Sequence, residues 1–314
     1  MDSICGLVDE IIIVDTGSTD KTKEIAKMYT DNVYDYKWEN DFSKARNYSF
    51  SKATKEYIYC ADADEILDEE NQKKFLQLKE TLLPEIDIVQ MKYSNQLEYN
   101  TVYNFDEEYR PKLYKRIRKF KFVEPIHEAV VLEPIVYDSE IVIIHKPTYS
   151  HASRDLSVFY NTYKDNNRLS KRLHNMYAKE LFIAGKDKDF KCAKEIFERT
   201  FNDVNRSIDE IKEACCVLVH VYRINNDIYN FYKFALKDVA SESCSEICYE
   251  LGEFYFNNKD YEEAIVWFYN AAYETTSILN CKYGQEKPIE GLVKSYKAIG
   301  NEEKAKEYMN KLIK

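Results

Sequence analysis

The sequence predicts an α/β domain with a mostly parallel sheet over residues 1–150, followed by an all-α helical repeat domain over residues 151–314. Short apolar runs, typical of buried strands, alternate with helical stretches in the first part. Acidic motifs follow two of these runs, and strand-like runs disappear after Ser150. A length of 314 residues also suits about two domains, each able to form a core.

The first expected strand is the apolar run over residues 10–14, which ends at Asp15. Gly17 permits a tight turn there, and residues 18–20 are suitable caps for a helix over 21–29. In open parallel sheets, ligands bind at the carboxyl ends of strands, which is the position of Asp15. The chain contains no G-x-G-x-x-G or G-x-x-x-x-G-K-[ST] motif, so we expect phosphates to meet a carboxylate-bound metal instead of a glycine-rich loop.

A second expected strand, Tyr57-Ile-Tyr-Cys60, is followed by Asp62, Asp64 and Glu65. On a continuous strand, Asp62 and Asp64 would share one side about 7 Å apart. Three carboxylates without a basic neighbour are costly unless a cation joins them, which predicts a site for a divalent metal and a diphosphate. The alternative is a helix N-terminus, with Asp62 or Asp64 as the N-cap of a helix that begins at Glu65.

Two further segments extend the candidate site. A predicted amphipathic helix carries Arg46 and Asn47, whose guanidinium and amide groups could contact a nucleotide or could simply form a solvated helix face. The apolar strand over residues 141–144 ends at His145, so an imidazole is expected where a strand stops. That histidine is either a metal ligand or a structural residue.

A basic run precedes Glu128 in the sequence. We expect it to form a solvated strand pair whose positive charge attracts anions. Glu128 could pair across that hairpin with Lys112 or Arg116, or it could act as a base. The basic residues of this run are Lys112, Lys115, Arg116, Arg118, Lys119 and Lys121.

Three motifs in this order resemble those of the family 2 glycosyltransferases. They are Ile13-Val-Asp-Thr-Gly-Ser-Thr-Asp20, Trp38-Glu-Asn-Asp-Phe-Ser-Lys-Ala-Arg-Asn47 and Ala61-Asp-Ala-Asp-Glu65. The resemblance continues through residues 109–115, 123–128 and 143–146, so it covers about the first 150 residues. It implies a glycosyltransferase A-type, nucleotide-diphospho-sugar transferase fold. With the helical part, the chain is most similar to bacterial transferases that carry tetratricopeptide repeats, among them the sublancin-type peptide glycosyltransferases.

The resemblance implies a role for each candidate residue on the donor side. Asp15 would accept hydrogen bonds from the uracil or ribose, and Asp62 would face the ribose. Arg46 and Asn47 would contact the nucleotide. Asp64 would bind a divalent cation that bridges the two phosphates, with His145 as a further ligand. Nitrogen and carboxylate donors together favour manganese over calcium. The cofactor that the resemblance implies is a divalent cation, Mn²⁺ or Mg²⁺.

On the acceptor side, the resemblance implies an inverting, metal-dependent transfer from a nucleoside diphosphate sugar, with a UDP-hexose as the candidate, to a protein, peptide or glycan. A single displacement needs a base opposite the leaving diphosphate, for which Glu128 is the candidate and Asp87 and Asp106 are rivals. Arg110 resembles the arginine of the family's Arg-Leu-Phe element, which Pro111 and a lysine interrupt here.

One departure from the family favours a different class of function. Family members usually begin with an additional strand and helix, whereas nine residues precede Glu10 here. A parallel crossover needs about a dozen residues. The alternative prediction is therefore a catalytically impaired scaffold that acts through its helical repeats.

Composition predicts a reduced, cytoplasmic protein. A formal net charge of -10 argues against nucleic acid as a partner. The eight cysteines form no C-x-x-C pair, which favours reduced thiols. We find no secretion signal and no apolar run of the roughly 20 residues that a membrane span needs.

Helical periodicity continues from residue 151 to the C-terminus and predicts irregular tetratricopeptide-like repeats. Small and large apolar residues alternate as in helix pairs that pack closely, at spacings of roughly 37 to 41 residues instead of the usual 34 or so. Stacked pairs offer a concave surface for a peptide, or an interface for a homodimer. The pattern residues are Leu181, Ala184, Phe190, Ala193 and Phe197, then Leu251, Tyr255, Tyr261, Ala264, Phe268 and Ala271, then Leu292, Tyr296, Ala305 and Met309, with a weaker copy over 211–240.

Overall fold

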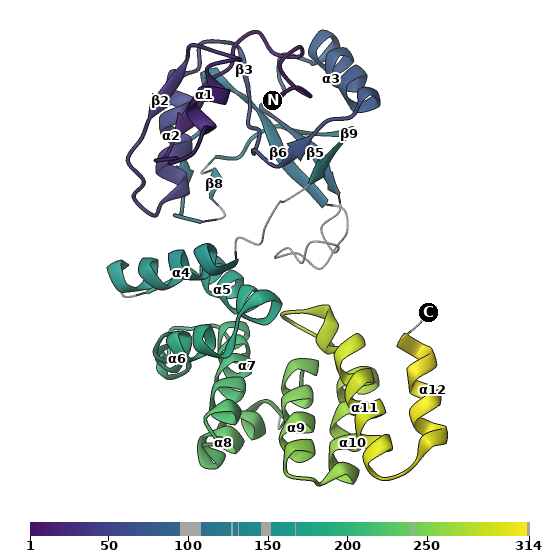
Figure 1. The fold of residues 1–314 in the computed structure, drawn as a ribbon. Helices are drawn as coiled ribbons and strands as arrows, with labels where there is room; N and C mark the ends of the chain where they lie inside the picture. Colours follow the sequence, from purple (N-terminus) through teal and green to yellow (C-terminus); the bar gives the residue numbers. More distant parts are fainter. Residues whose placement is uncertain are drawn as a thin grey trace. The chain divides into compact units, whose positions relative to one another are not determined.

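The computed structural model describes residues 1–94, 108–126, 128–130, 132–145, 152–166, 168–239 and 242–312. The chain divides into two compact units, Met1–Asn161 and Thr162–Lys314 (Figure 1). The first is an α/β unit and the second is helical, which confirms the predicted fold class. The division falls inside helix α4 (Ala152–Asn166), whereas the sequence predicts a boundary at residues 150–151.

Short strands and helices alternate in the first unit. In chain order they are β1 (Ile13–Asp15), α1 (Thr22–Ala26), β2 (Val33–Asp35), α2 (Phe42–Lys52), β3 (Tyr57–Tyr59), β4 (Glu65–Ile66), α3 (Glu69–Thr81), β5 (Ile88–Ser94), β6 (Glu108–Lys115), the 3-10 turn Arg116–Arg118, β7 (Phe122–Val123), β8 (Ala129–Val130) and β9 (Val136–His145).

The described strands form a mixed sheet instead of the expected mostly parallel one. Five strands are ordered β3-β6-β5-β9-β4, and only β5 and β9 run parallel within this sheet. β1 and β2 form a separate parallel pair, and β7 and β8 an antiparallel one. Antiparallel neighbours can follow short connections, whereas each parallel pair requires a crossover of a dozen or more residues.

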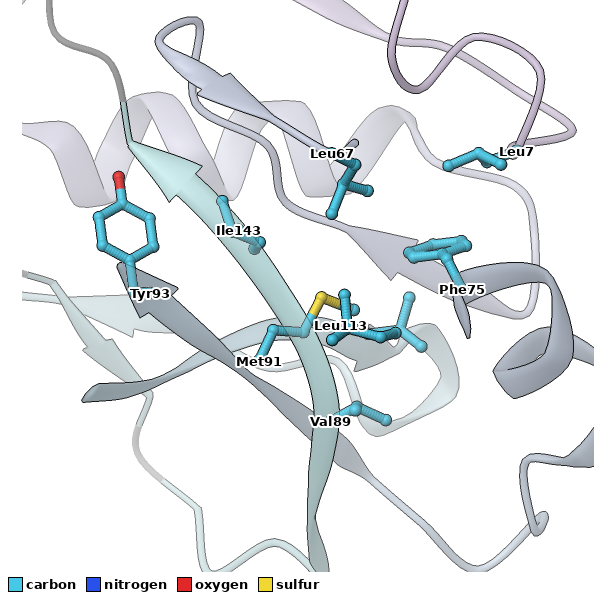
Figure 2. Packing of buried hydrophobic residues seen from close by; sticks show 9 residues of the cluster. Leu7, Leu67, Phe75, Val89, Met91, Tyr93, Leu113 and Ile143 are labelled. Atoms are coloured by element: carbon cyan, nitrogen blue, oxygen red, sulfur yellow. The ribbon is translucent and has the colours of Figure 1, made fainter. Parts of the chain in front are cut away.

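The main core of the first unit lies between the five-stranded sheet and helix α3. Alternation along β5 buries Val89 and Met91 on the same face. Leu113 of β6 and Ile143 of β9 extend this apolar face, and Phe75 of α3 covers it (Figure 2). This packing positions the end of β3, which Asp62 and Asp64 follow, and the end of β9, where His145 lies.

The second unit consists of helices stacked in chain order (Figure 1). They are α5 (Lys171–Ala184), α6 (Asp187–Asn202), α7 (Ile208–Ile224), α8 (Ile228–Val239), α9 (Ser245–Asn257), α10 (Tyr261–Tyr269), which continues as the π-helical turn Asn270–Glu274, then the 3-10 turn Cys281–Tyr283, α11 (Glu286–Ala298) and α12 (Glu302–Leu312). No described helix is both long and apolar enough to cross a membrane.

The predicted repeats coincide with pairs of neighbouring helices. α9 packs on α10 and α11 on α12, as the two clearest sequence copies predict. In the earlier copy, rings on α5 and α6 meet, with Phe182 and Phe190 at a centroid separation of 5.3 Å. The weaker copy forms α7 and α8, which also pack together.

Close packing in this unit centres on Phe268 of α10. Gly252 of α9 and Gly291 of α11 both contact its ring, and a Cβ added at either position would lie 2.6 or 2.7 Å from ring carbons. Phe268 is fully buried, so its ring has no room to move away. The two glycines therefore allow three helices to approach around one aromatic side chain.

We expect Gly252→Ala and Gly291→Ala each to lower the free energy of unfolding by about 1–2 kcal/mol. Overpacking costs about 1–3 kcal/mol, which exceeds the gain in helix propensity of about 1 kcal/mol. Urea unfolding followed by circular dichroism measures the effect. The control is Gly6→Ala, whose added Cβ would meet nothing within 4 Å. A stabilised Gly252→Ala variant would contradict this packing.

Candidate functional site

Asp15 lies at the end of β1, as predicted, and its carboxylate caps the following turn. It accepts hydrogen bonds from the backbone N–H groups of Gly17 and Ser18 at 3.1 Å. The Lys23 ammonium lies 3.5 Å away. Burial opposes the charge, but the hydrogen bonds from Ser18 and Gly17 outweigh it and hold the pKa of Asp15 below its ordinary value. The carboxylate is thus ionised and held in place, and its contact with a nucleotide stays a prediction.

Asp62 and Asp64 lie in the loop between β3 and β4, and they contact different partners. β3 ends at Tyr59, so the prediction that one strand carries both acids on the same side is wrong. The helix alternative is also wrong, because Glu65 begins β4, which pairs with β9, and the next helix has Asp68 as its N-cap. Because Asp62 and Asp64 lie in a loop, the alternation of side chains along a strand does not set the directions of their side chains.

Lys112 of β6 supplies the cation that the local sequence lacks. Its Nζ contacts the buried carboxylate of Glu65 and lies 3.2 Å from Asp62 Oδ2. Lys112 is itself only 4% exposed, so the expectation that it belongs to a solvated basic strand is wrong. The sequence analysis did not predict this buried role. The feature that could have indicated it is the position of Lys112 directly before Leu113 and Tyr114, which are apolar residues of the same strand.

The charges of this trio affect one another. Burial disfavours ionised Asp62, but Lys112 and Arg46 outweigh that effect and lower its pKa. Burial and the charge of Asp62 raise the pKa of Glu65, although Lys112 opposes the rise. Of the two carboxylates, Asp62 is the one that carries full charge, and its side chain is 44% exposed. It is therefore the carboxylate of the trio that a ligand can reach.

Arg46 of α2 connects Asp62 with Glu128. Its Nε pairs with Glu128 Oε1, and its Nη2 lies 3.7 Å from Asp62 Oδ1. The guanidinium also contacts the Cys60 thiol and lies over the Phe122 ring, 5.5 Å from its centroid. The structure thus brings together three residues that the sequence separates, and it pairs Glu128 with Arg46 instead of with Lys112 or Arg116.

Asn47 has a positioning role in this structure. Its amide nitrogen donates to the Phe122 carbonyl at 2.9 Å, and its amide oxygen accepts from the Phe122 N–H at 2.9 Å. These two bonds fix β7 to α2 and thereby the ring under Arg46. A nucleotide contact through the Asn47 amide would have to displace one of them, so that contact stays a prediction.

Asp64 and His145 meet where the β3–β4 loop crosses the end of β9. His145 Nε2 lies 3.3 Å from Asp64 Oδ2, and this contact lowers the pKa of Asp64. Neighbouring ligands of an octahedral cation with bonds of about 2.1 Å are roughly 3.0 Å apart, so the two donors suit one divalent ion. Among the described residues, no third histidine, cysteine or acidic donor joins them in a compact cluster.

The two rival candidates for the catalytic base are Asp87 and Asp106. Asp87 is buried and accepts from the Ile135 N–H at 3.1 Å, with Arg118 at 3.5 Å, so it anchors the start of β5. Asp106 and His127 lie outside the described residues. Arg110 pairs with Glu108 and lies 4.0 Å from the centroid of the Tyr93 ring.

A cavity of about 880 Å³ lies between β1 and β3. Apolar residues such as Val14 and Ile58 line most of it, and Arg46 and Asp62 line one polar end. Asp64 and the remaining candidate residues lie outside its lining. The cavity therefore touches the Asp62 side of the site and separates the β1–β2 pair from the larger sheet.

Comparison with known proteins defines the class of this fold and site. The sequence profile described as "Glycosyl transferase family 2" matches residues 1–131, which contain all of the predicted site residues except His145. Residues 1–131 therefore form a family 2 glycosyltransferase domain, and a tetratricopeptide-like helical unit follows in the chain.

Among individual relatives, the chain is 31% identical over 245 residues to the SPbeta prophage-derived glycosyltransferase SunS of Bacillus subtilis (strain 168), covering 67% of this chain and 53% of that protein. It is 43% identical over 65 residues to a TPR repeat-containing protein of Synechococcus elongatus, covering 21% of this chain and 16% of the relative. A solved structure of S. aureus TarS covers 85% of both chains at 14% identity and a TM-score of 0.33. The chain spans about half the length of SunS.

Proposed function

We propose that this chain is a metal-dependent inverting glycosyltransferase. It transfers a sugar from a nucleoside diphosphate sugar, with a UDP-hexose as the preferred candidate, to a protein, peptide or glycan acceptor. The observation that carries this proposal is the 3.3 Å approach of Asp64 to His145 at the end of β9, two residues from the Asp62 carboxylate that Arg46 and Lys112 hold. The family membership of residues 1–131 supports it.

On the donor side, Asp64 and His145 hold the divalent cation, Mn²⁺ or Mg²⁺. The bound ion supplies positive charge where the nucleoside diphosphate departs. The exposed Asp62 carboxylate accepts hydrogen bonds from the ribose, and Arg46 pairs with phosphate oxygens. Asp15, held by its turn, accepts from the base or ribose.

On the acceptor side, Glu128 takes the proton from the attacking group while the bond between the sugar and the diphosphate breaks. Its carboxylate is one-tenth exposed and pairs with Arg46, which keeps it oriented. One displacement of this kind inverts the anomeric carbon and needs no covalent enzyme intermediate. We rank peptide or protein acceptors first because stacked helix pairs offer extended surfaces for peptides.

Glu128→Gln is expected to lower kcat by about 10²- to 10⁴-fold, because the variant keeps the size of the side chain but cannot take a proton. UDP binding should change little, and sugar transfer and UDP titration measure the two effects separately. The control is Glu133→Gln, because Glu133 is an exposed acid five residues after Glu128 in the sequence. A loss of UDP binding equal to the loss of transfer would assign Glu128 to the support of Arg46 instead.

A non-catalytic scaffold is the second candidate function. The cavity between β1 and β3 favours it, because none of the described strands joins the β1–β2 pair to the five-stranded sheet through hydrogen bonds. Titration of UDP with and without Mn²⁺ separates the two candidates. Absence of binding at any manganese concentration would support the scaffold.

A further inference from the structure

Two buried thiols and a buried carboxylate meet in the helical unit, in a place that the proposed transfer reaction does not use. Cys216 lies on α7, and Cys244 and Glu246 lie at the start of α9. The two sulfur atoms are 3.4 Å apart. One donor atom from each of the three residues lies within 4.8 Å of the other two, and all three residues are at most 2% exposed.

The donor chemistry selects a thiophilic divalent ion. Thiolates favour zinc-class ions and disfavour Mg²⁺, Ca²⁺ and Mn²⁺, which prefer oxygen donors. Two Zn–S bonds of about 2.3 Å at a tetrahedral angle place the sulfurs about 3.8 Å apart, so the pair needs to open by only about 0.4 Å. One carboxylate oxygen of Glu246 can supply a third ligand.

Backbone groups already orient that carboxylate. Its oxygens accept from the N–H groups of Ile278, Leu279 and Asn280 at 2.7 to 3.1 Å. Oε1 takes a bond from each of the three, whereas Oε2 takes only one, from Ile278, and so has capacity for a metal bond. Supporting bonds of this kind fix metal ligands in position.

The backbone N–H groups around Glu246 also balance the charge of a bound ion and its ligands. A divalent ion with two thiolates and one carboxylate carries a net charge of -1. The three N–H donors and the N-terminus of α9, where Cys244 is the N-cap, place positive partial charge around it. Cysteine thiols are ordinarily protonated at neutral pH and bind metal as thiolates, so binding of the ion by Cys216 and Cys244 releases two protons.

We propose that Cys216, Cys244 and Glu246 form a structural zinc-class site that joins α7, the start of α9 and the segment over residues 278–280. Bound metal would link segments that are separate in sequence and stabilise the stack of helices. The site is independent of the manganese site proposed in the first unit, and it does not require that the chain be an active transferase.

The test uses the whole chain, first stripped with a chelator and then given Zn²⁺ or Co²⁺ alone. We expect one tightly held ion per chain by mass spectrometry under native conditions, and a rise in Tm of about 5 °C with zinc. Cobalt should give the thiolate charge-transfer absorption of a sulfur-ligated ion, and Mn²⁺ or Mg²⁺ should give neither effect. Binding at pH 7 should release about two protons per ion.

Cys216→Ala/Cys244→Ala should abolish these effects. Cys215→Ala/Cys248→Ala is the matched control, because these thiols are equally buried on the same two helices but lie outside the cluster. If the first variant does not fold, the wild-type cobalt spectrum and proton release still decide the question. Wild-type protein that holds no zinc, or a control variant that loses it equally, would overturn the proposal.

Discussion

Asp64→Ala is expected to abolish manganese-dependent UDP binding and to lower sugar transfer by about 10³-fold or more. The change removes one of the two donors that the described residues supply, and His145 by itself is insufficient to hold a divalent ion against water. A bound ion contributes several kcal/mol of charge stabilisation, and each 1.36 kcal/mol or so corresponds to a factor of ten in rate. Calorimetric UDP titrations over a range of Mn²⁺ concentrations, together with turnover of a UDP-sugar, measure the two effects.

His145→Ala should reproduce the loss of metal-linked binding, because both donors serve the same ion. Glu69→Gln is the control, since this acid lies exposed in the first turn of the neighbouring helix α3. Thermal unfolding of each variant shows whether the fold is intact. An Asp64→Ala protein that binds UDP with unchanged manganese dependence would rule out this pair as the metal site.

Lys112→Met is expected to lower the free energy of unfolding by about 3 kcal/mol or more. Removing one partner of a buried ion pair leaves the other carboxyl either charged without a counterion or forced to take up a proton, and such a loss typically costs about 3–5 kcal/mol. We expect the lower end of this range of free energies, because Asp62 is 44% exposed and of the two carboxylates only Glu65 is buried. Denaturant unfolding, monitored through the sheet-containing unit, measures the loss.

A second substitution separates loss of charge balance from loss of packing. Glu65→Gln in the Lys112→Met background should recover part of the stability, because the amide carries no charge to desolvate. Lys121→Met, in the same basic run but exposed, should change stability by no more than about 0.5 kcal/mol. Equal losses for the two lysine variants would show that Lys112 is not the internal counterion.

The helical unit could be predicted well from the sequence because its signals are local. Residues that recur every three or four positions place α9 to α12 and the earlier pairs, and the structure confirms these helices. The specific role of Gly252 and Gly291 was less visible, since it depends on both helices approaching the same Phe268 ring. Periodicity predicts a buried face, but it does not specify which side chain of another helix fills it.

In the α/β unit, the sequence places Asp15 and His145 correctly at strand ends. It does not predict the contacts of the acidic loop. Asp62 and Asp64 lie beyond the end of β3, so strand alternation does not orient their side chains. Asp62 contacts Lys112, which is 50 residues away in the sequence, and Asp64 contacts His145, which is 81 residues away. Strand pairing determines these contacts. In the mixed sheet, β6 lies next to β3 and β9 lies next to β4, so Lys112 and His145 are close to the β3–β4 loop.

By itself, the sequence determined the helical repeats, several strands and helices of the first unit, the family motifs and the residue types available for chemistry, because these follow from local pattern and composition. The tertiary structure alone decided how the charges are compensated: Lys112 with Glu65 and Asp62, Arg46 with Glu128, and Asp64 with His145. The reason is physical. The cost of a buried charge depends on which opposite charge lies within a few ångströms in space, and that distance is set by the packing of segments far apart in the chain.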